Sequence, residues 1–312
     1  MLIISTFSSH KIGMGHFFRS LNLARQFNKK TLFLINKNKK CVKFLKNIKY
    51  EVVDYKKKNW EIKYIKKNTI WINDRLNTNL NHVKLLQNRD VFVVSIDDNG
   101  SGGKISNLNF AQNINITKIN STKKRKFLIL KKVNSKRIWV RKKINSIMIT
   151  LGGADTYNLT NKVIKKILSL NLNLKITVFV GPETNLSKNI ITNKNIHYKF
   201  SVKNLENQMC FYDLIICGGG VTPFNAASQG LPSFVIANEK HEINTAKYLQ
   251  KLKVSYYCGF RSININNKLI SKIKLMQMSK NGISKFDNNS LNNVIDDINI
   301  NYAKFKKNNN KQ

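Results

Sequence analysis

The stretch KIGMGHFFRS (11–20) places His16 directly after two glycines, Gly13 and Gly15. An apolar run ends shortly before it and an amphipathic segment follows it. A positioned general base can accelerate the attack of water by about 10²–10⁴-fold, and the ordinary pKa of histidine leaves the ring largely neutral in a cell. The spacing therefore predicts that His16 activates a nucleophile at a strand-to-helix corner. The alternative is that His16 only caps or packs the helix.

Two further glycine corners follow apolar runs, at 152–153 in LGGADTYNLTNKVIKKIL and at 218–220 in IICGGGVTPFNAASQGLP. Glycine lets a backbone come close to a ligand, and the start of the following helix favours an anion. In the later corner, Thr222 is expected to cap the helix and Pro223 suits its first turn. Both corners predict phosphate binding. The alternative is a tight turn that binds no ligand.

Two familiar phosphate motifs are excluded at these corners. A dinucleotide fingerprint needs a third glycine three residues after Gly15, and Phe18 stands there. A P-loop needs a Gly-Lys-Ser/Thr ending, which none of the corners has.

Three carboxylates also follow apolar runs: Asp74, and the pair Asp97 and Asp98. A carboxylate pair at a strand end could bind a divalent cation, orient a catalytic group or cap a turn. No histidine or further carboxylate is spaced to complete a metal site. We therefore favour a structural or supporting role near the active site, and the sequence predicts neither a metal nor a cofactor.

The elements that must position these residues alternate along the chain. Short β-branched runs are separated by helical patterns, as in HFFRSLNLARQF, where Phe17, Leu21 and Ala24 share a face. The runs lie at 2–6, 31–35, 51–55, 69–74, 91–98, 146–151, 174–180, 196–200, 213–217 and 233–237. Such alternation predicts parallel sheets in an α/β protein.

We divide the chain into an α/β domain at 1–143 that carries His16, a second α/β domain at 144–300 and a loose basic tail at 301–312. Ligands bind beyond the carboxyl ends of parallel strands, and a cleft between two such domains is the default site. One domain would then offer an imidazole and the other would offer phosphate-binding loops.

The charge is strongly positive, with 55 Lys and Arg against 16 Asp and Glu and a formal net charge of +39 over 312 residues. Lysines are spread along the whole chain among many asparagines, which indicates a general bias in amino-acid composition and not a basic binding patch. No aromatic-rich basic motif, zinc pattern or helix-turn-helix signature is present, so a specific nucleic-acid partner is not expected. The surplus charge would still attract anionic substrates, and weakly an anionic membrane surface.

The cysteines indicate the cellular compartment of the protein. The four cysteines are scattered without CxxC spacing, which predicts a reducing cytoplasm. No apolar run approaches the length of a membrane span, and no signal peptide is evident. We expect a cytoplasmic monomer.

Four segments together resemble a known family: SSHKIGMGHFFRSLNLARQF, VSIDDNG, ITLGGADTYNLT and IICGGGVTPFNAASQGLP followed by NTAKYLQ. Over residues 1–260 they are similar to the UDP-sugar hydrolases of pseudaminic acid biosynthesis, and to spore-coat polysaccharide proteins regarded as glycosyltransferases. The resemblance implies a GT-B fold, in which two Rossmann-like domains face each other across a cleft. It also implies metal-independent release of UDP from a diacetamido-trideoxyhexose.

The resemblance assigns roles to individual positions. It implies that His16 is catalytic, within a corner formed by Gly13 and Gly15. It implies that the loops that hold the UDP include Gly152, Gly153, Gly219, Gly220, Val221 and Thr222, and that polar residues facing the nucleotide and the sugar include His241, Glu242 and Asn244. From their own positions at a glycine corner and at strand ends, we add Gly218 and Asn225 to the nucleotide-binding residues and Asp74, Asp97 and Asp98 to the substrate cleft.

Two departures from the family bear on which sugar the protein uses and on its activity. Asn225 stands where the family usually has a glutamate that accepts hydrogen bonds from the ribose, and it lacks the charge-assisted gain. Lys131 and Lys132 stand where the family tends to have an arginine and acidic residues.

Three functions are consistent with these residues and with the charge. The first is a UDP-sugar hydrolase that uses His16, and the second is a GT-B glycosyltransferase in which an acceptor hydroxyl replaces water. The third, a basic nucleic-acid-binding protein, has no supporting motif.

Overall fold

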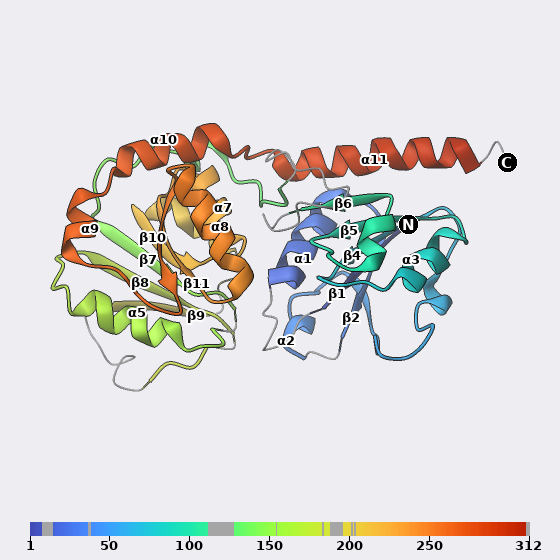
Figure 1. The fold of residues 1–312 in the computed structure, drawn as a ribbon, viewed down its shortest axis with the longest axis horizontal. Helices are drawn as coiled ribbons and strands as arrows, with labels where there is room; N and C mark the ends of the chain where they lie inside the picture. Colours follow the sequence, from blue (N-terminus) through green and yellow to red (C-terminus); the bar gives the residue numbers. More distant parts are fainter. Residues whose placement is uncertain are drawn as a thin grey trace. The chain divides into compact units, whose positions relative to one another are not determined.

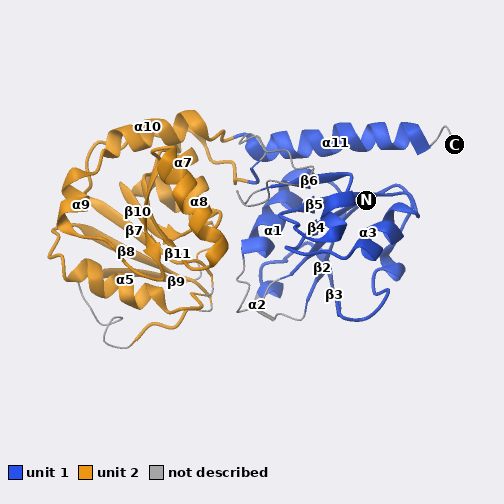
Figure 2. Cartoon of the chain, viewed as in Figure 1, with its two compact units in different colours: residues 1–129, 289–312 blue, residues 130–288 orange. Residues whose placement is uncertain are grey.

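The computed structural model describes residues 1–7, 15–36, 39–111, 128–153, 155–182, 184–187, 196–200, 202 and 204–309. These residues form two compact units, one made of residues 1–129 and 289–312 and the other of residues 130–288 (Figure 2). Each unit is built around one parallel six-stranded sheet (Figure 1).

The sheet of the first unit has the strand order β3-β2-β1-β4-β5-β6, with every neighbouring pair parallel. The strands are β1 (Leu2–Thr6), β2 (Thr31–Ile35), β3 (Lys49–Val52), β4 (Thr69–Asp74), β5 (Val91–Ile96) and β6 (Leu108–Phe110). The helices of this unit are α1 (Gly15–Phe27), α2 (Lys39–Val42), α3 (Leu80–Gln87), α4 (Ser101–Ile105) and α11 (Ser290–Asn309). The order reverses between β1 and β4, as in a Rossmann fold.

Helices cover both faces of this first sheet. On one face, α1 and α11 bury a core with β1 and β4 that includes Phe17, Ile72 and Val294. On the other face, α3 packs Val83 against Trp71. Because both faces are covered, the strands read as continuous apolar runs, and β4 and β5 are buried at every position.

The second sheet repeats the same order, β12-β11-β10-β7-β8-β9, and is also parallel throughout. Its strands are β7 (Ser146–Thr150), β8 (Lys175–Val180), β9 (Ile196–Phe200), β10 (Leu214–Gly218), β11 (Ser233–Ala237) and β12 (Ser255–Phe260). Its helices are α5 (Leu159–Leu168), α7 (Thr222–Ser228), α8 (Lys240–Lys251), α9 (Asn267–Lys272) and α10 (Leu275–Lys285). The strand order reverses between β7 and β10.

The predicted fold class, two Rossmann-like α/β domains with parallel sheets, is confirmed. All ten expected strands form, and the shared face of α1 is buried at Phe17, Leu21 and Ala24. Two strands, β6 and β12, were not expected. The first has only three residues, and the second carries the polar and aromatic sequence SYYCGF, so neither reads as an apolar run.

The compact units divide the chain at other residues than the predicted domains. The predicted boundary was 143/144, but residues 130–143 belong to the second unit. Hydrogen bonds hold this segment there. The backbone N–H of Lys131 donates to Asn225, and the Arg141 guanidinium donates to several backbone carbonyls, including that of Tyr212 at 3.2 Å. Burial lowers the pKa of Arg141 to about 10.

The C-terminal segment also differs from the expected loose tail at 301–312. Helix α11 continues to Asn309, so of the expected tail only residues 310–312 lie outside the described residues. Its apolar face returns to the first unit, where Leu291 and Val294 join the core and Tyr302 and Phe305 pack against Phe92. The few aromatic residues of the tail are sufficient because they extend an already buried helix face.

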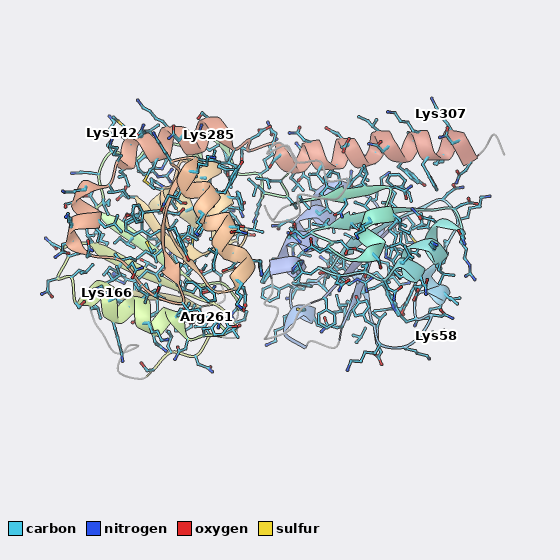
Figure 3. The ribbon with its side chains drawn as sticks, in the orientation of Figure 1. Lys58, Lys142, Lys166, Arg261, Lys285 and Lys307 are labelled. Carbon is cyan, nitrogen blue, oxygen red and sulfur yellow. The ribbon has the colours of Figure 1, made fainter. Side chains whose placement is uncertain are left out.

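Lysines lie on the surfaces of both units, as the labelled examples Lys58, Lys142, Lys166, Lys285 and Lys307 show (Figure 3). Their positions on different elements agree with a charge that is distributed over the chain. Among the described helices, none is both long and apolar enough to cross a bilayer.

Candidate functional site

The candidate residues of the first unit meet where its strand order reverses. His16 is the second residue of α1, which follows β1, and Asp74 is the last residue of β4, which pairs with β1. In open parallel sheets, ligands bind beyond the carboxyl ends of the strands at such a reversal. The fold therefore brings His16 to the position where this architecture binds ligands.

His16 and Asp74 form a close pair. The Nδ1 atom of His16 lies 2.7 Å from Oδ1 of Asp74, whose side chain is fully buried while that of His16 is 14% exposed. A carboxylate accepts hydrogen bonds, so Nδ1 carries the proton and donates it to Asp74. The Ser20 hydroxyl donates to the other carboxylate oxygen at 2.8 Å. The Nε2 atom of His16 is consequently the ring nitrogen that remains to accept a proton.

Arg19 lies one helical turn after His16 and is buried between two carboxylates. Its Nε atom donates to Asp74 Oδ2 at 3.1 Å, one terminal nitrogen donates to Asp74 Oδ1 at 2.5 Å, and the other donates to Asp97 Oδ2 at 2.5 Å. This guanidinium also lies 3.0 Å from His16 Nδ1, because both groups donate to the same oxygen of Asp74. One cluster of charged and polar side chains results, the His16 cluster, which consists of His16, Arg19, Ser20, Asp74 and Asp97.

The charges of the cluster stabilise one another. Burial acts to raise the pKa of Asp74, but the nearby Arg19 and His16 outweigh it and hold that pKa well below its ordinary value. Burial acts to lower the pKa of Arg19, but Asp74 and Asp97 raise it above its ordinary value. Asp74 is thus an ionised carboxylate in contact with an imidazole.

An imidazole oriented by a buried carboxylate is suited to accept a proton. The carboxylate selects the tautomer with the proton on Nδ1 and stabilises the imidazolium that forms when Nε2 takes a proton. The same arrangement serves the attack of water or of an alcohol.

Asp98 does not join the cluster. Its Oδ1 atom accepts hydrogen bonds from the backbone N–H groups of Thr78 at 3.0 Å and Gly100 at 2.8 Å, and its Oδ2 atom contacts the Thr78 hydroxyl. The side chain therefore ties together the loops that follow β4 and β5. Of the neighbouring pair of aspartates, only Asp97 reaches the His16 cluster, through Arg19.

In the second unit, the corner at 218–220 is occupied by a carboxylate. The Gly219 N–H donates to Oε2 of Glu242 at 3.2 Å, and the Asn238 N–H donates to the same oxygen at 2.7 Å. A Cβ atom on Gly219 would lie 2.7 Å from Cβ of Glu242, so only glycine fits without displacing α8. On Gly220, a Cβ atom would lie 3.6 Å from Glu242 Oε1.

Glu242 has a structural role in addition to its place at the corner. It forms a capping box with Glu239 at the start of α8. Burial raises the pKa of Glu242, although hydrogen bonds from the backbone of Asn238, Glu239 and Gly219 and the nearby His241 act against the shift.

The earlier corner, at 152–153, follows β7, the strand that pairs with β10. Gly152 has φ +95°, which side chains disfavour, and its missing Cβ faces open space. Both glycine corners therefore lie at the carboxyl ends of adjacent strands, where the second sheet reverses its order.

The other predicted residues are placed as follows. Asn225 is buried in α7, and its side-chain oxygen accepts a hydrogen bond from Lys131 at 3.2 Å. Helix α7 begins at Thr222 with Val221 at the N-cap, so Thr222 is not the expected cap. His241 and Asn244 are exposed on α8.

Gly13 lies outside the described residues. Gly15 begins α1, and a Cβ atom there would meet nothing within 4 Å. Its place at the corner therefore does not require glycine for space.

Arg19 and Ser20 belong to the cluster but were not predicted from the sequence. Both are buried polar residues on an otherwise apolar helix face, three and four residues after His16. Because residues at these spacings are neighbours on a helix, the spacing from His16 was the available signal.

Among the described residues, no group of three or more His, Cys, Asp or Glu side chains is arranged to hold a metal ion.

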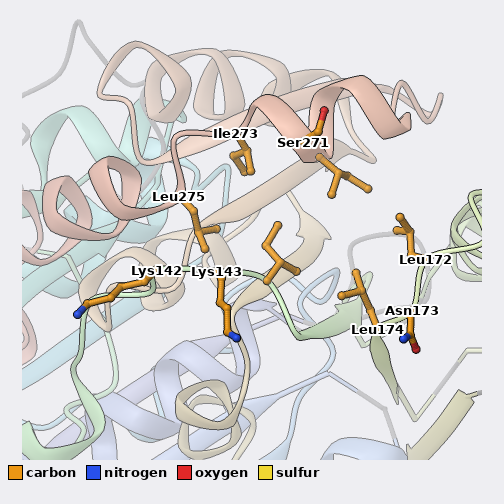
Figure 4. Close-up of a pocket in the computed structure, with 10 residues that line it drawn as sticks. Lys142, Lys143, Leu172, Asn173, Leu174, Ser271, Ile273 and Leu275 are labelled. Atoms are coloured by element: carbon orange, nitrogen blue, oxygen red, sulfur yellow. The ribbon is translucent and has the colours of Figure 1, made fainter.

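A pocket of about 350 Å³ lies in the second unit, at the end of the sheet opposite to the glycine corners (Figure 4). It is lined mainly by aliphatic side chains such as Leu172, Leu174 and Leu275, near the amino ends of β7 and β8. This pocket is separate from the glycine corners, which follow the carboxyl ends of the strands.

A distant relative is found among known sequences, although no family model matches the chain. An uncharacterized protein of Methanocaldococcus jannaschii, MJ1062, is 26% identical over 291 residues, which cover 82% of this chain and 59% of that protein. The chain thus spans about three-fifths of the length of this relative.

Comparison with solved structures identifies the fold. MurG of Acinetobacter baumannii has a TM-score of 0.63 at 13% identity and covers 96% of this chain and 99% of its own. The glycosyltransferase SsfS6 of Streptomyces sp. SF2575, complexed with thymidine diphosphate, has a TM-score of 0.62 at 10% identity and covers 96% and 98%. A UDP-N-acetylglucosamine 2-epimerase has a TM-score of 0.55 at 11% identity and covers 96% of both chains. The chain therefore has the fold of GT-B glycosyltransferases and of UDP-N-acetylglucosamine 2-epimerases.

Proposed function

We propose that this protein is a sugar-nucleotide hydrolase that releases UDP from a UDP-linked diacetamido-trideoxyhexose. The product would serve the biosynthesis of nonulosonic acids of the pseudaminic type or of surface polysaccharides. The observation that carries the proposal is the 2.7 Å contact between His16 and the buried Asp74 at the reversal of the first sheet. The sequence resemblance supports the choice of substrate.

In the proposed reaction, Nε2 of His16 removes a proton from water as the water oxygen attacks the anomeric carbon. The bond between that carbon and the UDP oxygen breaks, and UDP leaves with the electron pair. Asp74 stabilises the imidazolium that forms. The step needs no metal or cofactor, because the proton acceptor and the leaving group are supplied by the protein and the substrate.

The glycine corners of the second unit would hold the nucleotide. Gly152 and Gly153 would approach the diphosphate closely, together with the turn that runs from Gly220 into Val221 and Thr222. The Gly219 N–H already donates to Glu242, so we assign Gly219 to shaping the turn and not to direct phosphate binding.

Glu242 would replace the family glutamate that accepts hydrogen bonds from the ribose and that is Asn225 in this sequence. Its Oε2 atom is engaged by backbone N–H groups, whereas Oε1 lies beside Gly220 and would accept a hydrogen bond from a ribose hydroxyl. Asn225 would then act indirectly, by holding Lys131 against α7. His241 and Asn244, both exposed on α8, would face the nucleotide or sugar.

A glycosyltransferase is the second candidate. The known structures with this fold include the glycosyltransferase SsfS6, and that observation favours an acceptor hydroxyl in place of water. The same imidazole would then remove the proton from the acceptor.

The deciding experiment is incubation of the purified protein with a panel of UDP-sugars, without acceptor, and measurement of free UDP and free sugar. Release of both without acceptor supports the hydrolase. Release of UDP only after addition of an acceptor alcohol supports the transferase. Lack of release under both conditions with every sugar would contradict both proposals.

The setting of the reaction remains a prediction. Four free cysteines favour the cytoplasm, and we expect a monomer. The excess of lysine would add a weak, salt-sensitive attraction to an anionic membrane surface.

A further inference from the structure

Arg19 makes more contacts with the His16 cluster than structural support of a helix requires. Its guanidinium donates to both oxygens of Asp74 and also to Asp97, and its side chain is only 4% exposed. A buried charge is costly unless it is paired and hydrogen-bonded. Here one cation bridges two carboxylates from the ends of two adjacent strands, β4 and β5.

The geometry of the contact with Asp74 fixes the plane of that carboxylate. The Nε atom and one terminal nitrogen of Arg19 contact the two carboxylate oxygens at 3.1 and 2.5 Å, which is the forked arrangement available to arginine but not to lysine. With the carboxylate held in this plane, Oδ1 points at His16 Nδ1. Ser20 secures Oδ2.

We propose that Arg19 is a positioning residue for His16: its fork holds the Asp74 carboxylate in the one orientation that keeps the His16 proton on Nδ1 and leaves Nε2 free. Asp97 holds Arg19 in turn. The inference rests on the proposed function only in taking His16 as the base, since the orientation itself is a property of the unliganded protein.

The groups that face the imidazole have opposing effects. Asp74, from β4, favours a positively charged ring. Arg19, from α1, opposes it from 3.0 Å, and Asp97, at the end of β5, acts through Arg19. Loss of Arg19 would remove the fork that fixes the plane of the Asp74 carboxylate, so Oδ1 would no longer be held towards His16 Nδ1.

The experiment measures the ring of His16 directly. Two-bond ¹H–¹⁵N spectra of protein labelled at histidine report the tautomer of each ring, and a His16→Asn sample assigns the signal. The variants are Arg19→Lys, which keeps the charge but loses the fork, and Arg19→Met, which loses both. Arg25→Met is the matched control, because Arg25 is exposed on the same helix and its guanidinium donates a hydrogen bond to the Phe44 carbonyl oxygen, at 3.3 Å, and not to the His16 cluster.

We expect the wild-type ring to be a single Nδ1–H tautomer at neutral pH. Arg19→Met should give a mixture of tautomers, because nothing then fixes the plane of the Asp74 carboxylate. Arg19→Lys, which keeps the charge but loses the fork, should also give a mixture, and should lower kcat by about tenfold with little change in KM. Arg25→Met should match the wild type.

The inference is overturned if a folded Arg19→Met protein keeps the single wild-type tautomer. Should Arg19→Met not fold, the same unchanged tautomer in folded Arg19→Lys overturns it. The two proposals fail separately: altered ring signals in a protein whose His16→Asn variant still turns over would retain the positioning role and reject His16 as the base.

Discussion

The Nδ1 atom of His16 and the Oδ1 atom of Asp74 lie 2.7 Å apart although 58 residues separate them in the sequence. The contact exists because β1 and β4 are neighbours in the sheet, with Thr6 in register with Asp74, and α1 begins beyond β1. The pair is therefore a consequence of the Rossmann strand order.

Asp74→Asn is expected to lower the free energy of unfolding by about 3 kcal/mol, because it leaves the buried Arg19 with Asp97 as its remaining carboxylate partner. Urea unfolding followed by circular dichroism measures the loss. Asp54→Asn, at an exposed carboxylate, is the control and should change stability by about 0.5 kcal/mol or less. Equal stabilities of the two variants would show that the cluster is not coupled to folding.

The effect of Asp74 on stability should depend on pH. Its pKa is lowered in the folded protein, so its contribution is fully present above the unfolded value of about 3.9 and is lost as the pH falls towards the folded value. The stability difference between wild type and Asp74→Asn should therefore be constant from pH 7 to about pH 5 and shrink below about pH 4. A difference that grows on acidification would mean that Asp74 is not held ionised.

Gly219→Val should weaken UDP binding by at least about tenfold, because a side chain there displaces Glu242 and distorts the corner. Calorimetry with UDP measures the affinity. Gly259→Ala is the control: Gly259 has φ +121° and a more crowded position, but it lies in β12, an edge strand two places from β10, so a folded Gly259→Ala protein should bind UDP as tightly as the wild type. If folded Gly219→Val bound UDP as tightly as the wild type, the nucleotide would have to bind elsewhere.

Turnover is expected to persist in excess EDTA. The two carboxylates that could suggest a metal site are engaged with different protein groups, Asp97 with Arg19 and Asp98 with backbone N–H groups. Free UDP is measured with and without the chelator. Loss of activity that magnesium or manganese restores would return the metal-dependent reaction to consideration.

The sequence was sufficient for the fold because buried parallel strands are apolar at nearly every position and helices between them carry one apolar face. It also singled out His16, Asp74 and the glycine corners as candidate site residues, since glycines and charged residues are conspicuous at strand ends. Arg19 was not predicted as part of the site, because a charged residue on a helix usually lies on the surface. Its burial depends on Asp74 and Asp97, which are distant in the sequence and close only after β4 and β5 have paired.

The glycine corner at 218–220 shows a second limit of prediction from the sequence. The sequence pattern predicted backbone N–H groups free to bind phosphate, but the Gly219 N–H donates to Glu242, which lies in the following βα unit. The C-terminal helix shows a third limit: residues 301–309 have few apolar side chains, and they are ordered because α11 docks on a core formed by the first half of the chain.

The most direct test of His16 as the base is the turnover of His16→Asn with the UDP-sugar that the wild type cleaves, alongside His197→Asn, which changes an exposed histidine on β9. We predict that His16→Asn folds, binds UDP about as tightly as the wild type and turns over at least about 10²-fold more slowly, the scale of a lost general base. His197→Asn should retain full activity. A folded and saturable His16→Asn protein that kept more than about a tenth of the wild-type rate would contradict the assignment of His16 as the base.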